Sequence, residues 1–252
     1  MGIKIGILGQ DGFLGTHLYN YLRIKEDVVR IPSLREVFNS QKSLAQFAEK
    51  CDVIVHFAGK SRSDNMQELY DNNMSTVHHL INAMKSKQLK PLVLFSSTIH
   101  ENRESLYHKS KRDGDKAFQE WAIKNNAKAI TLVMPNVFGP YCKPNFNSFV
   151  ATFCSKIANG EKVEIINDVP VELIYIHDLC KEIYSLIVNK VSAKKYYFKS
   201  STEKNVSQVR SLLECFKQSL EQGNIPTLKN FFEINLFNTF LSYYNNMLRI
   251  LE

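Results

Sequence analysis

Short apolar runs recur along the first part of the chain, and most are apolar at consecutive positions rather than at every second one. The runs are IKIGIL (residues 3–8), residues 28–31, CDVIVHFAG (51–59), PLVLFSS (91–97) and KAITLVM (128–134). Strands that are buried on both faces of a parallel sheet produce this pattern. We therefore predict a strand in each of these places.

The segments between these runs carry apolar residues at helical spacing. Residues 16–23, 42–50, 68–87 and 107–125 are predicted helices, so strand and helix alternate up to about residue 140. Such alternation is typical of a parallel sheet covered on both faces. The predicted fold class is α/β, a Rossmann-like doubly wound sheet.

The pattern changes after Pro140. A loop (141–148) precedes a predicted helix (149–160) and a predicted strand, KVEIIN (162–167). VELIYIHDL (171–179) leads into a helix that ends near residue 188, and an amphipathic helix (211–220) precedes an aromatic-rich end (230–246). We expect a core of residues 1–140 and a smaller C-terminal lobe of residues 141–252, interleaved with the last strands of the sheet. The terminal aromatics are expected to pack over that lobe or at a subunit interface.

Composition excludes several classes of protein. With 44% hydrophobic residues the 252-residue chain can bury a core, and no apolar run is long enough for a membrane span. The start, MGIKIGILG, lacks the features of a secretory signal. The five cysteines are odd in number and lack CxxC spacing, which favours reduced thiols in the cytoplasm over disulfides or a metal site.

The chain is basic, with 32 lysines and arginines against 25 acidic residues and a net charge of +7. This balance favours a polyanionic partner, either nucleic acid or phosphate-bearing small molecules, although it also serves solubility. The basic residues are spread along the chain without an arginine-rich arm or a recognisable nucleic-acid motif. We expect a phosphate-rich cofactor and substrate, and no nucleic-acid or membrane partner.

A glycine-rich turn follows the first predicted strand. Gly9, Gly12 and Gly15 form GxxGxxG and open the first predicted helix. Glycine lets a pyrophosphate approach the backbone amides at a helix N-terminus, and the third glycine allows close packing of helix on strand. A lone triplet often marks only a turn, but the strand–turn–helix context predicts dinucleotide binding.

The end of the second predicted strand bears on the choice between NAD and NADP. NAD-selective sites place an acidic residue about 20 positions after the glycine turn. Here Asp27 comes early, while Arg30 and Arg35 flank the expected strand end. Arginine favours a 2′-phosphate, so NADP is the predicted cofactor and NAD is the alternative. Both arginines could also be ordinary exposed residues without a role in binding.

Tyr107 and Lys111 are spaced i, i+4 at the start of a predicted helix and therefore share one face. A phenol with a pKa near 10 is a poor acid–base group at neutral pH, and a neighbouring cation lowers that pKa. Tyr107 is therefore a candidate proton donor, and Lys111 is the candidate cation that lowers its pKa. YxxxK also occurs by chance on surfaces.

The glycine turn, the strand ending HFAG, the strand ending FSST and YxxxK follow one another in an order that resembles the short-chain dehydrogenase/reductase superfamily. The extended, sugar-nucleotide branch (the NAD-dependent epimerase/dehydratase family) fits best. The resemblance implies a catalytic set of Thr98, Tyr107 and Lys111, with Ser96 and Ser97 as alternatives to Thr98. The cofactor residues that it implies are Gly9, Gly12, Phe13, Leu14, Gly15, Arg30, Arg35, Phe57, Ala58, Gly59, Asn73, Lys111 and Pro135.

Two later segments, 142–162 and 225–244, sharpen the resemblance to the reductase half of capsule and O-antigen enzymes that make UDP-N-acetyl-L-fucosamine precursors. This implies that residues 1–140 form the NAD(P)-binding core with the catalytic residues, and that residues 141–252 bind substrate. The implied reaction is NADPH-dependent reduction of a UDP-4-keto-6-deoxy-hexosamine at C4. In that family a zinc-binding cupin domain follows. Here we expect a separate cupin-type epimerase or a shortened form, and a homodimer.

The implied substrate residues are Asn136, Lys143, Asn145, Asn147 and Ser148. Asparagines in loops are also common turn formers. One departure from the family is Val133, where extended members usually carry an arginine. Tyr175 and Asp178 match a family motif that is often structural.

Two alternatives remain open. An epimerase or dehydratase of the same fold would recycle tightly held NAD, although Ile99 and His100 stand where dehydratases usually carry acidic residues. A non-catalytic NADP-binding regulatory protein would not need an intact Thr, Tyr and Lys set.

Overall fold

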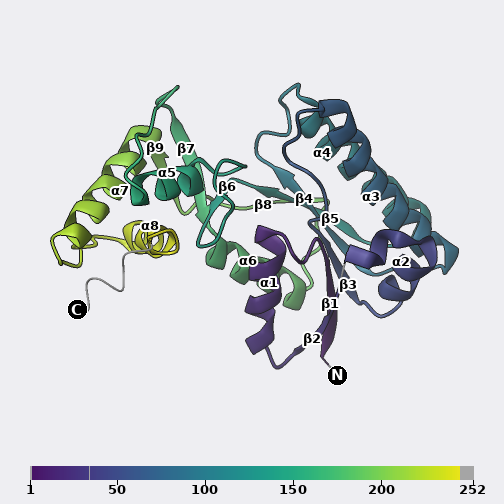
Figure 1. The fold of residues 1–252 in the computed structure, drawn as a ribbon. Coiled ribbons are helices and arrows are strands. Elements are labelled where there is room, and N and C mark those ends of the chain that lie inside the picture. The colour runs from purple at the N-terminus through teal and green to yellow at the C-terminus, as the bar shows by residue number, and fades with distance from the viewer. Residues whose placement is uncertain (1, 34, 245–252) are drawn as a thin grey trace. The chain divides into compact units, whose positions relative to one another are not determined.

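A computed structural model describes residues 2–33 and 35–244 and divides the chain into two compact units. The first unit contains residues 1–134 and 180–198, and the second contains residues 135–179 and 199–252. The chain thus passes between the units three times, as the colours of Figure 1 show. The expected boundary at residue 140 lies six residues beyond the observed one at Met134, because the short strand that follows pairs within the second unit.

The first unit is built on a six-stranded sheet whose paired strands are all parallel. The strand order is β2-β1-β3-β4-β5-β8. The order reverses between β1 and β3, which creates a crevice at their carboxyl ends. The strands are β1 (Ile3–Leu8), β2 (Val28–Ile31), β3 (Val53–His56), β4 (Leu92–Thr98), β5 (Ala129–Met134) and β8 (Lys195–Tyr197).

Helices cover both faces of this sheet (Figure 1). On one face, α2, α3 and α4 bury a core with β1, β3, β4 and β5 that includes Trp121 and Phe118. On the other, α1 and α6 are in contact through the Tyr21 and Tyr184 rings, whose centres are 6.1 Å apart, and the Tyr184 hydroxyl also donates to both carboxylate oxygens of Asp27, before β2, at 2.8 and 2.9 Å. The helices are α1 (Phe13–Tyr21), α2 (Gln41–Ala48), α3 (Met66–Ser86), α4 (Leu106–Asn125) and α6 (Ile176–Val188), with short 3-10 helices η1 (Leu22–Ile24) and η2 (Arg35–Asn39).

In its residues up to 244, the second unit contains a three-stranded sheet of order β6-β7-β9 and three helices. Its core is rich in aromatic side chains, including Phe138, Phe153 and Phe216. The terminal aromatics Phe237 and Phe240 pack into this core, which agrees with the first of the two expected locations. The part of that segment beyond residue 244 lies outside the described residues. The elements are β6 (Asn136–Phe138), β7 (Pro170–Tyr175), β9 (Thr202–Asn205), α5 (Phe149–Ala158), α7 (Val206–Glu221) and α8 (Phe231–Leu241).

The predicted strand KVEIIN (162–167) is wrong. These residues form no strand, although Val163 and Ile165 still pack against the core of the second unit. Their alternation matched a strand, but no neighbouring described strand pairs with them, and Ile166 is 92% exposed. Shortly after Met134 the chain forms the short strand β6, which was not predicted.

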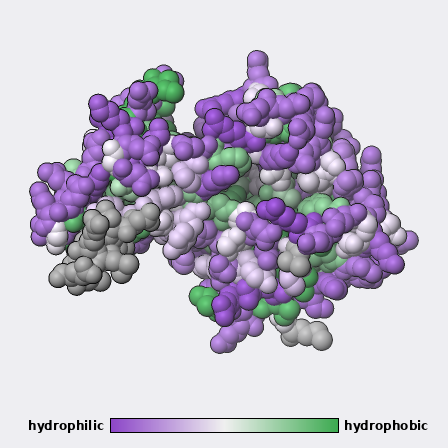
Figure 2. Space-filling view, in the orientation of Figure 1, coloured by the Kyte–Doolittle hydropathy of each residue, from purple (hydrophilic) through white to green (hydrophobic). Residues whose placement is uncertain are grey.

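Hydrophilic residues predominate on the molecular face shown in Figure 2. Among residues 2–33 and 35–244, no helix is long and apolar enough to span a membrane. Within the same described ranges, no group of His, Cys, Asp or Glu is arranged to hold a metal ion.

Candidate active site

The glycine-rich turn connects β1 to α1 at the point where the strand order reverses. Gly9 has a φ of +84°, and a Cβ built on it would lie 2.7 Å from the backbone nitrogen of Ala58, after β3. A Cβ on Gly15 would lie 2.1 Å from the Gly9 carbonyl oxygen. Both positions therefore require glycine for the fold itself.

Gly12 differs from the other two. It is the exposed N-cap residue of α1, and a Cβ there would come no nearer to the chain than 3.3 Å, at the Gly9 oxygen. A small side chain at this position would require the Gly9 oxygen to move by only a few tenths of an ångström. The absence of one keeps the first amides of α1 open, next to Phe13 and Leu14, and no acidic residue stands in the first helical turn. Exposed amides at a helix N-terminus suit a phosphate group.

The two predicted 2′-phosphate arginines are placed differently. Arg30 donates a hydrogen bond to the Tyr19 carbonyl oxygen at 3.1 Å and stacks 4.2 Å from the centre of the Tyr19 ring, so it is engaged with α1. Arg35 lies 3.6 Å from Asp11, within the glycine turn, and its side chain is 88% exposed. Of the two, Arg35 has the guanidinium that a bound phosphate could reach at the edge of the turn.

The segment after β3 is held by Asn73 of α3. The buried Asn73 side chain accepts from the backbone of Lys60 at 2.6 Å and donates to its carbonyl oxygen at 2.8 Å. It also donates to the Ser110 hydroxyl of α4 at 3.1 Å. Gly59 has a φ of +150°, and a Cβ there would lie 2.9 Å from the Asn73 oxygen. Asn73 therefore ties the predicted cofactor segment Phe57–Gly59 to the helix that carries Lys111.

The three hydroxyls that end β4 have different partners. Ser96 accepts a hydrogen bond from the Lys111 ammonium at 3.2 Å, and Ser97 donates to Glu101 at 2.9 Å. The Thr98 hydroxyl accepts from the backbone N–H of His100 at 3.2 Å and is partly exposed. Ser96 and Ser97 are thus engaged with side chains of their own chain. This favours Thr98 for a role towards substrate.

Lys111 lies beneath Tyr107 on one face of α4, as the i, i+4 spacing predicted. Its ammonium is 5.7 Å from the centre of the Tyr107 ring and 5.2 Å from that of Phe95. Lys111 is almost fully buried, and burial lowers its pKa from 10.5 to about 8. Ser105 caps this helix by accepting from the His108 backbone, which fixes the turn that carries Tyr107.

The pKa of Tyr107 is shifted in the direction opposite to the sequence-based expectation. Burial raises the pKa of its phenol, and the nearby Lys111 does not reverse that shift. The physical reason is desolvation, because the phenol loses water on folding and its charged form is then disfavoured. Tyr107 is therefore held in its protonated form at neutral pH.

His56, the last residue of β3, lies in the same buried region. Its ring packs 5.6 Å from the ring centres of Phe95 and Phe118, and neither ring nitrogen makes a hydrogen bond of normal geometry. Burial, with a smaller contribution from Lys111, lowers the pKa of His56 from 6.5 to about 4, and a weaker interaction with the Thr76 backbone opposes this shift. A neutral imidazole thus stands beside the buried ammonium.

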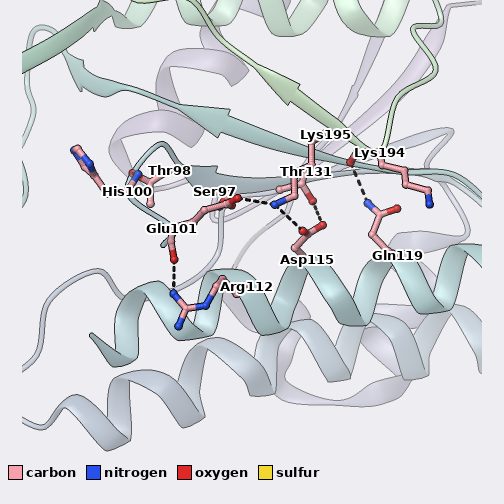
Figure 3. Close-up of polar contacts among 10 residues, drawn as sticks. All are labelled: Ser97, Thr98, His100, Glu101, Arg112, Asp115, Gln119, Thr131, Lys194 and Lys195. Atoms are coloured by element: carbon pink, nitrogen blue, oxygen red, sulfur yellow. Dashed lines mark hydrogen bonds and ion pairs between the residues drawn. The ribbon is translucent and has the colours of Figure 1, made fainter. Parts of the chain in front are cut away.

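Three charged residues near the end of β4 were not predicted. Glu101, Asp115 and Lys195 form an ion-pair network that includes Ser97 (Figure 3). Glu101 could have been noticed from its place three residues after Thr98. No spacing signal links Lys195 to them, because it lies 94 residues after Glu101 along the chain.

The predicted substrate residues belong to the second unit, together with Pro135. The Asn136 amide donates to the Glu172 carbonyl oxygen at 3.2 Å. Lys143, Asn145 and Asn147 are exposed in the loop before α5, where the Lys143 ammonium lies 5.6 Å from the centre of the Phe146 ring. Asn145 has a φ of +56°, which suits a turn, and Ser148 caps α5. Their roles towards substrate stay predictions.

The loop that carries these residues is attached to the end of α8. The Tyr141 N–H donates to the Ser242 hydroxyl at 3.2 Å, and the Tyr243 hydroxyl donates to the Cys142 carbonyl oxygen. At the end of β7, Tyr175 packs against Phe138, and Asp178 accepts from Ser201, which is consistent with a structural role for that motif.

Known proteins resemble this chain in sequence and in structure. A curated relative is the UDP-2-acetamido-2,6-beta-L-arabino-hexul-4-ose reductase of Pseudomonas aeruginosa, which is 26% identical over 96% of this chain. Among solved structures, the capsular polysaccharide assembling protein CapF of Staphylococcus aureus is 30% identical over 96% of this chain, with a TM-score of 0.81. The chain spans 65% of the length of each of these two proteins.

A more distant solved structure has the same fold. RMD from Pseudomonas aeruginosa, complexed with NADPH, has a TM-score of 0.80 and 17% identity over 96% of this chain and 100% of RMD. The sequence profile of the NAD dependent epimerase/dehydratase family matches residues 5–197, which include the whole glycine turn and the segment from Thr98 to Lys111. This chain belongs to the NAD dependent epimerase/dehydratase family.

Proposed function

We propose that the chain is an NADPH-dependent reductase that converts the C4 carbonyl of a UDP-4-keto-6-deoxy-N-acetylhexosamine into an alcohol, in the biosynthesis of a surface-polysaccharide nucleotide sugar. The observation that carries the proposal is a half-buried, protonated Tyr107 beside the Lys111 ammonium, at the carboxyl end of the sheet where the glycine turn also lies. The named activity of the Pseudomonas relative supports the choice of a hexulose reductase.

The residues at the carboxyl end of the sheet suit a dinucleotide. Gly12 leaves the N-terminus of α1 open although the fold does not require glycine there. Arg35 presents an exposed guanidinium next to the turn, which supports a ribose 2′-phosphate and hence NADPH. NAD remains the alternative cofactor.

In the proposed reaction the bound cofactor supplies a hydride to the carbonyl carbon. Tyr107 donates its phenolic proton to the carbonyl oxygen, which becomes a hydroxyl group, and Thr98 donates a hydrogen bond to the same oxygen. Lys111 then stabilises the tyrosinate until it takes a proton from solvent. A raised pKa of Tyr107 suits this direction, because a reductase needs the phenol to carry its proton at neutral pH.

The test is NADPH oxidation, followed at 340 nm, with a panel of UDP-4-keto sugars. Tyr107→Phe should abolish turnover while NADPH binding, measured by fluorescence, stays within about twofold of wild type, because only the proton donor is removed. Tyr70→Phe is the matched control: Tyr70 of α3 donates to Asp113 of α4, and the loss of its hydroxyl should leave turnover unchanged. Full activity of Tyr107→Phe would refute the assignment.

The first rival is an epimerase or dehydratase that recycles tightly held NAD. Glu101 is the first carboxylate after Thr98, and it is engaged by Ser97 and Lys195, which argues against a dehydratase base at this position. Consumption of one NADPH for each sugar reduced would separate a reductase from both rivals. A non-catalytic NADP-binding protein would show binding without any turnover.

The proposal includes a homodimer and a cupin-type epimerase that acts on the product at C3. Sedimentation equilibrium would test the first, and a monomer at micromolar concentration would exclude it. Product analysis with and without an added cupin-type epimerase would test the second.

A further inference from the structure

A charged network joins three segments of the first unit beside the end of β4. The Lys195 ammonium of β8 donates to Glu101 at 2.6 Å and lies 3.1 Å from Asp115 of α4 (Figure 3). The second oxygen of Glu101 accepts from Ser97, and the second oxygen of Asp115 accepts from Thr131 of β5 at 2.6 Å. All four carboxylate oxygens thus have partners.

Lys195 is the cation that allows two buried carboxylates to lie close together. The Glu101 and Asp115 side chains are only 11% and 12% exposed, against 30% for Lys195. Because both bind the same nitrogen, the two contacting oxygens are at most 5.7 Å apart, the sum of their two distances to it. Like charges at that separation repel strongly at low dielectric, so removing the cation would drive the carboxylates apart.

The network also holds the turn that follows the proposed catalytic threonine. The Glu101 N–H donates to the Thr98 carbonyl oxygen at 3.0 Å, and the His100 N–H donates to the Thr98 hydroxyl. Arg112, the residue after Lys111, donates to the backbone oxygens of Glu101 and Arg103. The segment between Thr98 and the start of α4 is therefore fastened at Glu101 from both sides.

We propose that Lys195 is a positioning residue: by holding Glu101 against Asp115, it fixes the turn after Thr98 and so the place of the Thr98 hydroxyl relative to Tyr107. Its ammonium binds Glu101 and Asp115, so it acts through them. This inference rests on the proposed reductase function, in which Thr98 and Tyr107 act on one oxygen atom. A displacement of about 1 Å in such a pair lowers turnover by about 100-fold.

The experiment compares Lys195→Met with Lys194→Met. Lys194 is the preceding residue, and its exposed side chain makes its replacement a control for the loss of one positive charge. Amide exchange by NMR would report the N–H groups of residues 99–101. These amides should exchange at least about 10-fold faster in Lys195→Met, because a turn that opens locally loses its protection, and should be unchanged in Lys194→Met.

Turnover gives a second readout. With an accepted sugar, Lys195→Met should lower kcat by about 10- to 100-fold, while the KM for NADPH stays within about twofold. Lys194→Met should match wild type. The single variant could be too unstable to assay. The double variant Asp115→Asn/Lys195→Met should then still fold, because it removes the repulsion between the two carboxylates. It should recover much of the lost Tm but not kcat, because Glu101 still lacks its cation.

Wild-type exchange at residues 99–101 and wild-type kcat in Lys195→Met would overturn the inference. So would joint recovery of Tm and kcat in the double variant, which would leave Lys195 a stability role only. A wild-type protein that oxidises no NADPH with any sugar would refute the proposed function instead. The exchange comparison would still decide whether Lys195 holds the turn.

Discussion

Lys111→Met should make the protein more stable while it abolishes activity. Lys111 is charged at neutral pH, yet it is buried and its pKa is lowered by desolvation. A folded-state pKa below the unfolded one means that folding is opposed by the charge. Methionine has a similar length and no charge, so it removes this penalty. Residues placed for chemistry often oppose stability in this way.

The size of the effect follows from the pKa. Its fall from 10.5 to about 8 amounts to about 3 kcal/mol at pH 7, since each pKa unit corresponds to about 1.4 kcal/mol. The variant also leaves the Ser96 hydroxyl without its donor, a loss of about 1 kcal/mol. We expect the free energy of unfolding to rise by about 2 kcal/mol.

The sign of the pH dependence is set by the two pKa values. The penalty is full below pH 8, shrinks as the pH rises from 8 to 10.5, and is absent above 10.5. The stability difference between variant and wild type should therefore be constant from pH 6 to 7 and fall by about 2 kcal/mol by pH 9.5.

Urea unfolding followed by circular dichroism at pH 6, 7 and 9.5 would measure this difference. Lys109→Met is the matched control, because Lys109 is exposed two positions earlier on the same helix, with its ammonium 5.2 Å from the Tyr70 ring centre. It should shift stability by less than about 0.5 kcal/mol at any pH. A less stable Lys111→Met, or a difference that does not shrink at pH 9.5, would refute the reasoning.

Three further predictions concern residues near the carboxyl ends of the strands of the first unit. The pKa of His56 is about 4 in the folded protein and 6.5 in the unfolded one, so the free energy of unfolding should fall by about 2 kcal/mol from pH 8 to pH 5. Urea titrations of His56→Leu should not show this loss. Gly15→Ala should lower the Tm or prevent folding, since its Cβ would meet the Gly9 oxygen at 2.1 Å, whereas Gly12→Ala should keep a normal Tm and weaken NADPH binding in fluorescence titrations. Equal effects of the two substitutions on Tm would contradict this division. Arg35→Ala should raise the KM for NADPH by about 10-fold, which corresponds to the loss of one charged hydrogen bond, and leave the KM for NADH unchanged. Equal changes for both cofactors would exclude a 2′-phosphate contact.

Much of the first unit could be predicted because its strands are buried on both faces. Runs such as VIVH and AITLVM are almost entirely apolar and are buried at every position, as a covered parallel sheet allows. The strands β6, β8 and β9 have three or four residues each, and their pairing depends on neighbours far along the chain. Local sequence carries little information about such strands.

The candidate site, too, could be predicted only in part from the sequence. Tyr107 and Lys111 share a helix face because of their spacing, so their proximity could be predicted. The pKa direction of Tyr107 could not, because it depends on how much water the folded chain excludes from the phenol. The partnership of Glu101 with Lys195 depends on the last strand joining the sheet.

The three passages of the chain between its units limit how this protein can be taken apart. A gene fragment that ended at Met134 would encode five strands and leave β5 as a bare edge, without the strand that supplies Lys195. Grafting the second unit from a relative requires two simultaneous replacements, residues 135–179 and the stretch from residue 199 onwards. A chimera made at a single crossover point therefore cannot exchange the second unit alone, because residues 180–198 of the first unit lie between its two segments.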